Sequence, residues 1–219
     1  LADLLRATSA SRDDQLVFVG DLVAKGPDSQ RVVQMARELG ARAVRGNHDE
    51  SVLRYRRALR AGCELPRLRK AHEQVVRTLL EEDWTYLEAL PASLELPALE
   101  AIAVHAGIVP GRPLDAQELV DLITMRTVRP DGSASSKLSE GVPWASRYGG
   151  PAHVVFGHDA VSGIQRHPFA TGLDTGCVYG GALTALVVPP LPRGTPYAVR
   201  EHGKLVSVDA HRVYEGYRA

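Results

Sequence analysis

Four short apolar segments of this sequence each end in side chains that can bind a metal ion, and this recurrence constrains the fold more than any other feature. The four segments are Phe18-Val19-Gly20-Asp21, Val44-Arg45-Gly46-Asn47-His48-Asp49, Val104-His105-Ala106-Gly107 and Val155-Phe156-Gly157-His158. A short apolar run followed directly by a polar residue is typical of a buried strand that delivers one side chain at its end. We therefore expect these Asp, Asn and His side chains to converge at one edge of a sheet.

The N-terminal part of the sequence predicts a strand, a helix and a second strand. Residues 16–19 and 41–44 have the apolar character of short buried strands. Between them apolar residues repeat at helical spacing, with Asp28 or Ser29 as a suitable N-cap and Gly40 as a suitable C-cap. A unit of this kind implies parallel strands joined by a right-handed crossover.

The remainder of the chain continues as a mixed α/β sequence. Residues 50–90 have helical periodicity, with breaks near Gly62 and Pro66. We expect strands at 94–96, 101–104, 183–188 and 205–208, a helix at 115–125, and a surface loop at 127–141. The C-terminal third is therefore mostly strand, and residues 1–219 are expected to form a single α/β domain.

The composition excludes some classes of protein. Lys plus Arg and Asp plus Glu number 26 each, so the overall charge gives no argument for binding to nucleic acid or to a membrane. No apolar run is long enough to span a bilayer. The two cysteines, Cys63 and Cys177, are far apart and make no disulfide framework, which favours a reducing compartment. We therefore expect a cytoplasmic protein.

One region has a local excess of positive charge. We interpret it first as the solvated face of a helix, and second as a surface that attracts polyanions. Its members are Arg54, Arg56, Arg57, Arg60, Arg67, Arg69 and Lys70.

The polar residues at the strand ends are suited to metal-dependent chemistry. Divalent cations such as zinc, manganese or iron accept the carboxylate, amide and imidazole ligands of Asp21, Asn47, His105 and His158. A carboxylate can bridge two ions, and such pairs activate water for phosphoryl transfer. His48 follows the ligand Asn47 and is placed to protonate a leaving oxygen, with Asp49 orienting its imidazole.

These ordered motifs resemble those of the calcineurin-like metallophosphoesterases. The motifs are Gly20-Asp21 with Lys25-Gly26-Pro27-Asp28-Ser29, Arg45-Gly46-Asn47-His48-Asp49, His105-Ala106-Gly107 and Gly157-His158. Within the family, the sequence is most similar to the branch of bacterial diadenosine tetraphosphatase. That similarity lies in the run from Gly172 to Thr184, and in Met125-Arg126 followed by Asp131-Gly132.

The resemblance implies a β-sandwich flanked by helices and assigns roles to matching positions. Asp21 matches the carboxylate that bridges two ions, and Asn47, His105 and His158 match the other ligands of the second metal site. The resemblance further implies that His48 is the general acid, with Asp49 as its partner.

Three cationic residues are implied as contacts for the substrate. Lys25 stands where many family members have an arginine that grips phosphate, and a lysine keeps the charge but loses the bidentate fork. This lysine form resembles a eukaryotic subgroup whose substrates include polyphosphate and nucleotide polyphosphates. Arg45, in the same loop as the ligand Asn47, and Arg126 are the other two candidates.

One departure from the family pattern concerns the first metal site. The family begins with an Asp-x-His motif on its first strand, whereas here Asp3 precedes Leu4-Leu5 and Asp13-Asp14 precede Gln15. We therefore expect an intact second metal site, an incomplete first site, and a domain that lacks its first strand.

Three functions follow as hypotheses. The first is a metal-dependent phosphoesterase that cleaves phosphoanhydrides in dinucleoside polyphosphates, polyphosphate or capped RNA ends by means of a metal-activated water. The second is a serine/threonine phosphoprotein phosphatase with the same chemistry. The third is a truncated, catalytically weak module that still binds metal. The first and second imply a phosphorylated substrate, with RNA involved only as a capped end, and no membrane partner.

Overall fold

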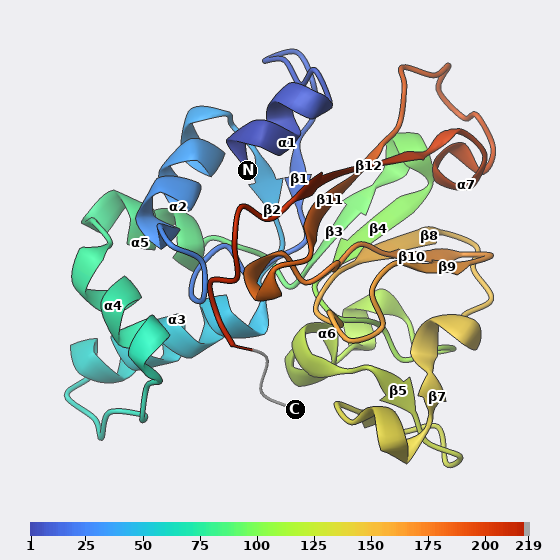
Figure 1. The fold of residues 1–219 in the computed structure, drawn as a ribbon. Coiled ribbons are helices and arrows are strands. Elements are labelled where there is room, and N and C mark those ends of the chain that lie inside the picture. The colour runs from blue at the N-terminus through green and yellow to red at the C-terminus, as the bar shows by residue number, and fades with distance from the viewer. Residues whose placement is uncertain (217–219) are drawn as a thin grey trace.

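The protein, described as a computed structural model over residues 1–216, places most helices on one side and most strands on the other (Figure 1). The helices are α1 (Ala2–Ala7), α2 (Ser29–Glu38), α3 (Asn47–Arg60), α4 (Lys70–Thr78), α5 (Glu81–Glu88), α6 (Leu119–Thr124) and α7 (Ala198–His202). The strands are β1 (Val17–Phe18), β2 (Arg42–Ala43), β3 (Ser93–Leu96), β4 (Ala101–Val104), β5 (Thr127–Val128), β6 (Ala134–Ser135), β7 (Val142–Pro143), β8 (His153–Phe156), β9 (Gln165–His167), β10 (Ala170–Gly172), β11 (Ala182–Val187) and β12 (Lys204–Asp209).

The predicted strand–helix–strand unit is present as β1, α2 and β2. Strands β1 and β2 pair in parallel, with Val17 opposite Arg42. Asp28 is the N-cap of α2, and its side chain accepts a hydrogen bond of 2.9 Å from the backbone N–H of Arg31. Gly40 follows the helix with a φ of +59°, a left-handed conformation that glycine adopts without strain.

The largest sheet has five strands in the order β3-β4-β8-β10-β9. Strand β8 lies at its centre, is buried along its whole length, and pairs in parallel with both β4 and β10. The outer strands β3 and β9 pair antiparallel with their neighbours. Because β4 and β8 run in the same direction, the residues that follow them emerge at the same edge of the sheet.

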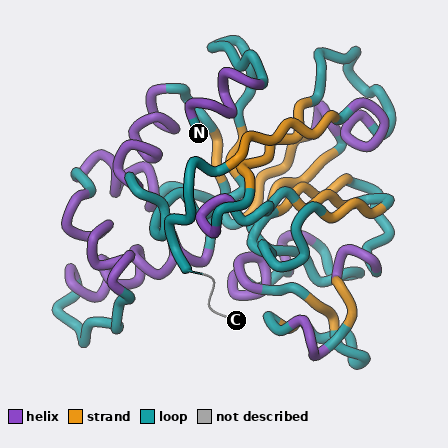
Figure 2. Tube along the Cα trace, in the orientation of Figure 1, coloured by secondary structure: helices purple, strands orange, loops and turns teal. Residues whose placement is uncertain are grey.

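The smaller sheets β1–β2 and β11–β12 pack against this five-stranded sheet. A shared hydrophobic cluster contains Val44 after β2, Leu96 of β3, Ala103 of β4 and Val155 of β8, with Leu186 of β11 packed against it. Figure 2 shows the strands of these sheets gathered together, with helices to either side. The α/β class and the sandwich-like packing predicted from sequence are therefore confirmed, as is the predominance of strand in the C-terminal third.

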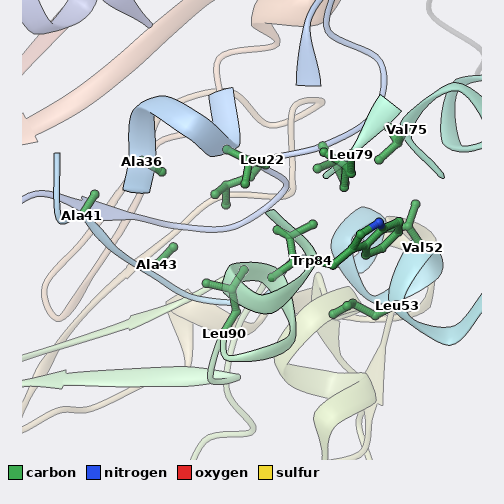
Figure 3. Packing of buried hydrophobic residues seen from close by; sticks show 13 residues of the cluster. Leu22, Ala36, Ala41, Ala43, Val52, Leu53, Val75, Leu79, Trp84 and Leu90 are labelled. Atoms are coloured by element: carbon green, nitrogen blue, oxygen red, sulfur yellow. The ribbon is translucent and has the colours of Figure 1, made fainter. Parts of the chain in front are cut away.

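Helices α2 to α5 form their own core with the β1–β2 unit. Val52, Leu53 and Trp84 are buried in this cluster, and the close-up in Figure 3 labels Leu22 and Val75 among its other members. The cluster fixes α4 and α5 against α3, whose N-terminus carries Asn47 and His48. Packing on the helical side therefore positions one part of the candidate site.

Three local predictions are wrong. The segment 127–141 is not a loop, because β5 pairs with β6 and β7 in a three-stranded sheet and Thr127 is fully buried. The helix expected at 115–125 is interrupted, with only α6 helical after a 3₁₀ turn at Leu114–Ala116. The interruption occurs where the side chain of Gln117 bonds to the backbone of Val109 and Arg112. The helix expected from residue 50 begins earlier, at Asn47.

None of the helices within residues 1–216 has the length and apolar character needed to cross a bilayer.

Candidate active site

The four predicted ligands come together at the carboxyl ends of two pairs of parallel strands. Asp21 and Asn47 follow β1 and β2, while His105 and His158 follow β4 and β8. The two pairs are connected directly, because His105 Nδ1 lies 2.7 Å from the carbonyl oxygen of Val19. Parallel pairing in each sheet therefore delivers all four side chains to one place, as the sequence predicts.

The distances between the ligand atoms are those of neighbouring ligands around one metal ion. His105 Nε2 lies 3.1 Å from Asn47 Oδ1 and 3.4 Å from Asp21 Oδ2. His158 Nδ1 lies 3.0 Å from the same Asn47 oxygen. Two ligands each about 2.1 Å from a cation lie about 3.0–3.4 Å apart in octahedral or tetrahedral geometry.

The other nitrogens of the two imidazoles donate to backbone carbonyls, which fixes the tautomers. His105 Nδ1 donates to Val19 and His158 Nε2 donates to Thr124, at 2.7 and 3.1 Å. In a neutral imidazole this leaves the lone pairs of His105 Nε2 and His158 Nδ1 directed at the oxygen of Asn47. Hydrogen bonds of this kind commonly orient histidines that bind metals.

Burial, with His105 and Arg126 as positive neighbours, lowers the pKa of His158 to about 3, so its Nδ1 is an acceptor near neutral pH. Two acceptors, His158 Nδ1 and Asn47 Oδ1, then face each other at 3.0 Å. This arrangement is unfavourable without positive charge, and a divalent cation supplies it. The donor set therefore fits a metal ion.

Asn47 is essential to that fit. Within residues 1–216, no group of three or more His, Cys, Asp or Glu side chains is arranged to hold a metal ion. The amide oxygen of Asn47 lies between the two imidazoles and links them to the Asp21 side of the site.

The charge distribution favours an ionised Asp21. Burial by itself would raise the pKa of this carboxyl group, but the imidazoles of His105 and His48 hold it well below its usual range. Burial also opposes the charged form of His105, yet the Asp21 carboxylate raises the pKa of His105 overall. Asp21 is thus an anion beside His105 and His48.

The backbone around the ligands adopts conformations that are uncommon elsewhere. Asp21 and His158 have φ values of 54° and 69°, in the left-handed region that non-glycine residues rarely occupy. Such strain is often found at functional sites. At Gly46, a Cβ atom would collide with the backbone and carboxylate of Asp21, so only glycine permits the close approach expected from the sequence.

The structure does not place Asp49 beside the imidazole of His48, contrary to the prediction. Its buried carboxylate accepts hydrogen bonds from the backbone N–H groups of Gly46, Asp21 and Val23, at 2.8, 2.9 and 3.3 Å. Asp49 lies in the first turn of α3, which directs its side chain back to the chain entering the helix. Burial, with the adjacent Asp21, raises the pKa of Asp49 to about 7.

The partner of His48 is another histidine. His48 Nδ1 lies 2.8 Å from Nε2 of His72 on α4, and the two rings are stacked with centroids 5.0 Å apart. The opposite nitrogen, His48 Nε2, faces the ligand group and lies 3.9 Å from Asp21 Oδ2. Burial lowers the pKa of His48 to about 4.

A cavity of about 720 Å³ opens over these residues. Lys25 and Arg126, two of the predicted substrate contacts, line it. Lys25 Nζ donates to Tyr179 Oη at 2.7 Å, and Arg126 Nη1 donates to the carbonyl oxygen of Ser136 at 2.9 Å. Both cations are therefore held in place beside the ligand group.

Arg45, the third predicted contact, is not among the residues lining this cavity. Its guanidinium pairs with Glu50 at 3.1 Å and donates to the carbonyl oxygens of Glu88 and Leu90. Arg45 therefore ties the β2–α3 turn to the end of α5, and the structure does not bring it together with Lys25 and Arg126.

Three other residues that the sequence left unassigned belong to the cavity. His72 and Tyr179 line it beside His48 and Lys25, and Asp174 lines it with a pKa raised by burial. Tyr179 and Asp174 lie within the Gly172–Thr184 run, whose resemblance to one family branch was the available signal. No sequence signal marks His72, since its role depends on packing between α3 and α4.

Comparisons with known proteins indicate the family of this chain. The model of the calcineurin-like phosphoesterase family matches residues 1–174. The asymmetrical bis(5'-nucleosyl)-tetraphosphatase PrpE of Geobacillus sp. (strain WCH70) is 31% identical over 206 positions, covering 84% of this chain and 81% of the relative. The symmetrical bis(5'-nucleosyl)-tetraphosphatase of Janthinobacterium sp. (strain Marseille) is 28% identical, covering 85% and 87%.

A crystal structure of a candidate diadenosine tetraphosphatase is also similar. It superposes with a TM-score of 0.79 at 36% identity, over 100% of this chain and 88% of that one. The order of the ligand motifs, their convergence at the strand ends and these similarities agree with one another. This chain therefore belongs to the calcineurin-like phosphoesterase family of hydrolases.

Proposed function

We propose that this chain is a metal-dependent hydrolase of phosphoanhydride bonds, with dinucleoside polyphosphates and linear polyphosphate as its substrate class. One observation carries the proposal: the acceptor group formed by Asp21, Asn47, His105 and His158 lies in a cavity that Lys25 and Arg126 also line. A cation site next to two fixed positive charges suits a substrate with several adjacent phosphates.

The names of the relatives favour this substrate class over others. The two relatives described above are named for dinucleoside tetraphosphates. Neither name concerns RNA, so capped RNA ends, which the sequence left open, are not part of the proposal. A phosphoprotein substrate is kept as the alternative outcome of the test.

Asp21, Asn47, His105 and His158 would hold the metal ion. When bound, a divalent cation supplies charge neutralisation for a phosphoryl oxygen and a coordinated water of lowered pKa. Lys25, with its ammonium fixed by Tyr179, and Arg126 bind the remaining phosphate oxygens and hold the scissile group against the ligands.

His48 supplies the proton for the leaving oxygen. Its Nε2 faces the ligand group, while Nδ1 lies 2.8 Å from His72 Nε2. In the charged form, Nδ1–H donates to His72 and Nε2–H is free to donate to the leaving group. The phosphates of a bound substrate raise the pKa of His48 from its low value in the empty site, and so load this proton.

The segment before β1 contains no Asp-x-His motif, which the family resemblance implies at that place for the other metal ion. We therefore propose that residues 1–219 alone bind one ion and hydrolyse slowly, because Asp21 is the one ligand of the other site within residues 1–216. The same chain preceded by a strand carrying Asp-x-His is proposed as the fully active form.

Both forms should be tested with zinc, manganese and iron(II) in turn. Release of phosphate is measured from diadenosine tetraphosphate, inorganic polyphosphate and a phosphoserine peptide. We expect the extended form to cleave the two anhydrides faster than the peptide, and the 219-residue form to follow the same order at lower rates. Faster cleavage of the peptide than of both anhydrides would favour a phosphoprotein phosphatase. No cleavage by the extended form would favour a module that only binds metal.

A further inference from the structure

The connection between α3 and α4 extends the candidate site beyond the metal ligands. This segment, residues 61–69, leads from the end of the helix that carries Asn47 and His48 to the helix that carries His72. Two of its arginines, Arg67 and Arg69, line the same cavity as the ligand group. Both side chains are exposed, so they are accessible to a solute.

Arg54, Arg67 and Arg69 differ from the other arginines of the basic region in having no counter-ion within residues 1–216. Within residues 1–216, the side chains of Arg54, Arg67 and Arg69 form no hydrogen bond or ion pair. Three arginines of the same region are neutralised: Arg56 and Arg60 by Glu81 and Glu88, and Arg57 by Glu50. The solvated-face interpretation is therefore sufficient for Arg56, Arg57 and Arg60, whereas the cavity-lining Arg54, Arg67 and Arg69 are available to bind an anion.

The unpaired arginines connect two cavities. Arg67 lines the main cavity and also a neighbouring one of about 460 Å³, which Arg54 and Arg57 line as well. Glu64 is the one acidic residue among the described residues that line this second cavity, against three arginines. Positive charge thus continues outward from the metal ligands, in a chain whose overall charge is zero.

We propose that Arg69, Arg67 and Arg54 form an anion track that binds the phosphates of a linear polyphosphate chain beyond the one being cleaved. The inference rests on the proposed function, because it assumes that the scissile phosphate lies at Asp21, Asn47 and the two histidines. It adds a binding site for the distal part of the substrate, and it makes affinity increase with the number of phosphates.

Guanidinium groups suit this ligand because they bind phosphate oxygens in pairs and remain charged at all relevant pH values. Residues with no internal partner do not have to give up an ion pair in order to bind. Single-stranded RNA fits less well, since no aromatic side chain lines the second cavity among the described residues and unstacked bases bind best on aromatic rings.

Equilibrium titration tests the track without relying on hydrolysis. The zinc-loaded 219-residue chain, which is expected to hydrolyse slowly, is titrated on ice with pyrophosphate, tripolyphosphate and long-chain polyphosphate. The double variant R67A/R69A is titrated in parallel. We expect the variant to bind the long chain about a hundredfold more weakly, at about tenfold per lost charged contact. Its affinity for pyrophosphate should change less than about twofold. The dependence of affinity on salt should become shallower by about one unit of slope per lost contact.

Arg166→Ala is the matched control, because Arg166 is an exposed arginine on β9 that does not line either cavity. It should leave all three affinities unchanged. Diadenosine tetraphosphate, titrated alongside, shows whether a nucleoside end changes the preference for long chains. An equal loss for pyrophosphate and the long chain in R67A/R69A overturns the track, as does an equal effect of Arg166→Ala.

A single-stranded oligonucleotide of matched charge distinguishes phosphate chains from nucleic acid. We expect it to bind the native chain more weakly than long-chain polyphosphate, and tighter binding of the oligonucleotide overturns the proposal. The outcomes for track and activity are separable. Length-dependent binding without hydrolysis supports the track and contradicts the proposed function, whereas anhydride hydrolysis with no length preference does the reverse.

Discussion

His48 and His72 face each other nitrogen to nitrogen, with 2.8 Å between Nδ1 of the first and Nε2 of the second. The other nitrogen of His72 is buried and has no hydrogen-bond partner within residues 1–216. Among the described residues, His72 therefore hydrogen-bonds through its ring only to His48. A carboxylate that oriented the imidazole of His48 would have to lie where His72 Nε2 now lies. A neutral imidazole accepts the Nδ1 proton but contributes no negative charge, which leaves burial to dominate the low pKa of His48.

We expect His72→Phe to slow cleavage only where the leaving group needs a proton. Phenylalanine keeps the ring but removes the acceptor, so kcat should fall about tenfold for an alkyl phosphate and stay almost unchanged for p-nitrophenyl phosphate. His72→Gln retains an acceptor and should restore most of the rate.

A structural role for His72 would instead slow both reactions alike. Imidazole proton NMR gives a second measurement, independent of turnover. A slowly exchanging N–H signal shared by the two histidines should be present in the native chain and absent from the Phe variant.

Asn47→Ala should abolish tight metal binding. The amide oxygen lies 3.0 and 3.1 Å from the two imidazole nitrogens, and without it no oxygen ligand connects them. Mutation of a residue that only hydrogen-bonds to a metal ligand lowers the affinity for the metal about 10–100-fold. Loss of a ligand itself should lower that affinity further. The metal content measured by elemental analysis after dialysis should fall from one ion per chain to a small fraction of that.

The double variant His105→Ala/His158→Ala should lose its metal in the same way. An unchanged metal content in that variant would refute the ligand assignment.

Asp49→Ala should lower the free energy of unfolding by at least about 3 kcal/mol, because three backbone N–H groups lose their partner at about 1–3 kcal/mol each. Denaturant titration measures this change. Asp28→Ala is the control, since Asp28 caps α2 on the surface and should cost only about 0.5–2 kcal/mol. A smaller loss for Asp49→Ala than for Asp28→Ala would show that the three bonds contribute little.

The sequence predicted well that Asp21, Asn47, His105 and His158 converge. Each follows a buried strand, and a strand end determines the position of a residue without knowledge of distant packing. The sequence did not predict the side-chain directions of Asp49 and Arg45, because these depend on where α3 begins. Starting the helix at Asn47 turns Asp49 toward the backbone of Gly46, while Arg45 meets Glu50.

The remaining failures have the same origin in long-range contacts. Strands β5, β6 and β7 are two residues long, so they carry no periodic signal among turn-forming residues. Their pairing places Thr127 and Ser135 in the interior, which no local pattern indicates. His72 approaches His48 only because α4 packs on α3 across 24 residues of sequence.

His153 should make stability depend on pH independently of the metal site. It is buried on β8, its Nε2 contacts Thr171 Oγ1 at 2.9 Å, and burial lowers its pKa to about 4. The unfolded value is about 6.5, so between about pH 4 and 6.5 the unfolded chain binds more protons than the folded chain. The stabilisation is therefore complete above about pH 6.5 and is lost as the pH falls toward 4, by up to about 3 kcal/mol.

The measurement is the free energy of unfolding as a function of pH, for the native chain and His153→Gln, in chelator so that metal release does not contribute. Glutamine can keep the bond to Thr171 but does not titrate. The native chain should therefore lose more stability between pH 6.5 and 4 than the variant does. Other histidines with lowered pKa values, such as His158, are common to both proteins and cancel in the difference. His167→Gln is the control, because His167 lies on β9 of the same sheet with a partly exposed ring, and this variant should match the native curve. Parallel curves for the native chain and His153→Gln would mean that His153 titrates alike in the folded and unfolded states.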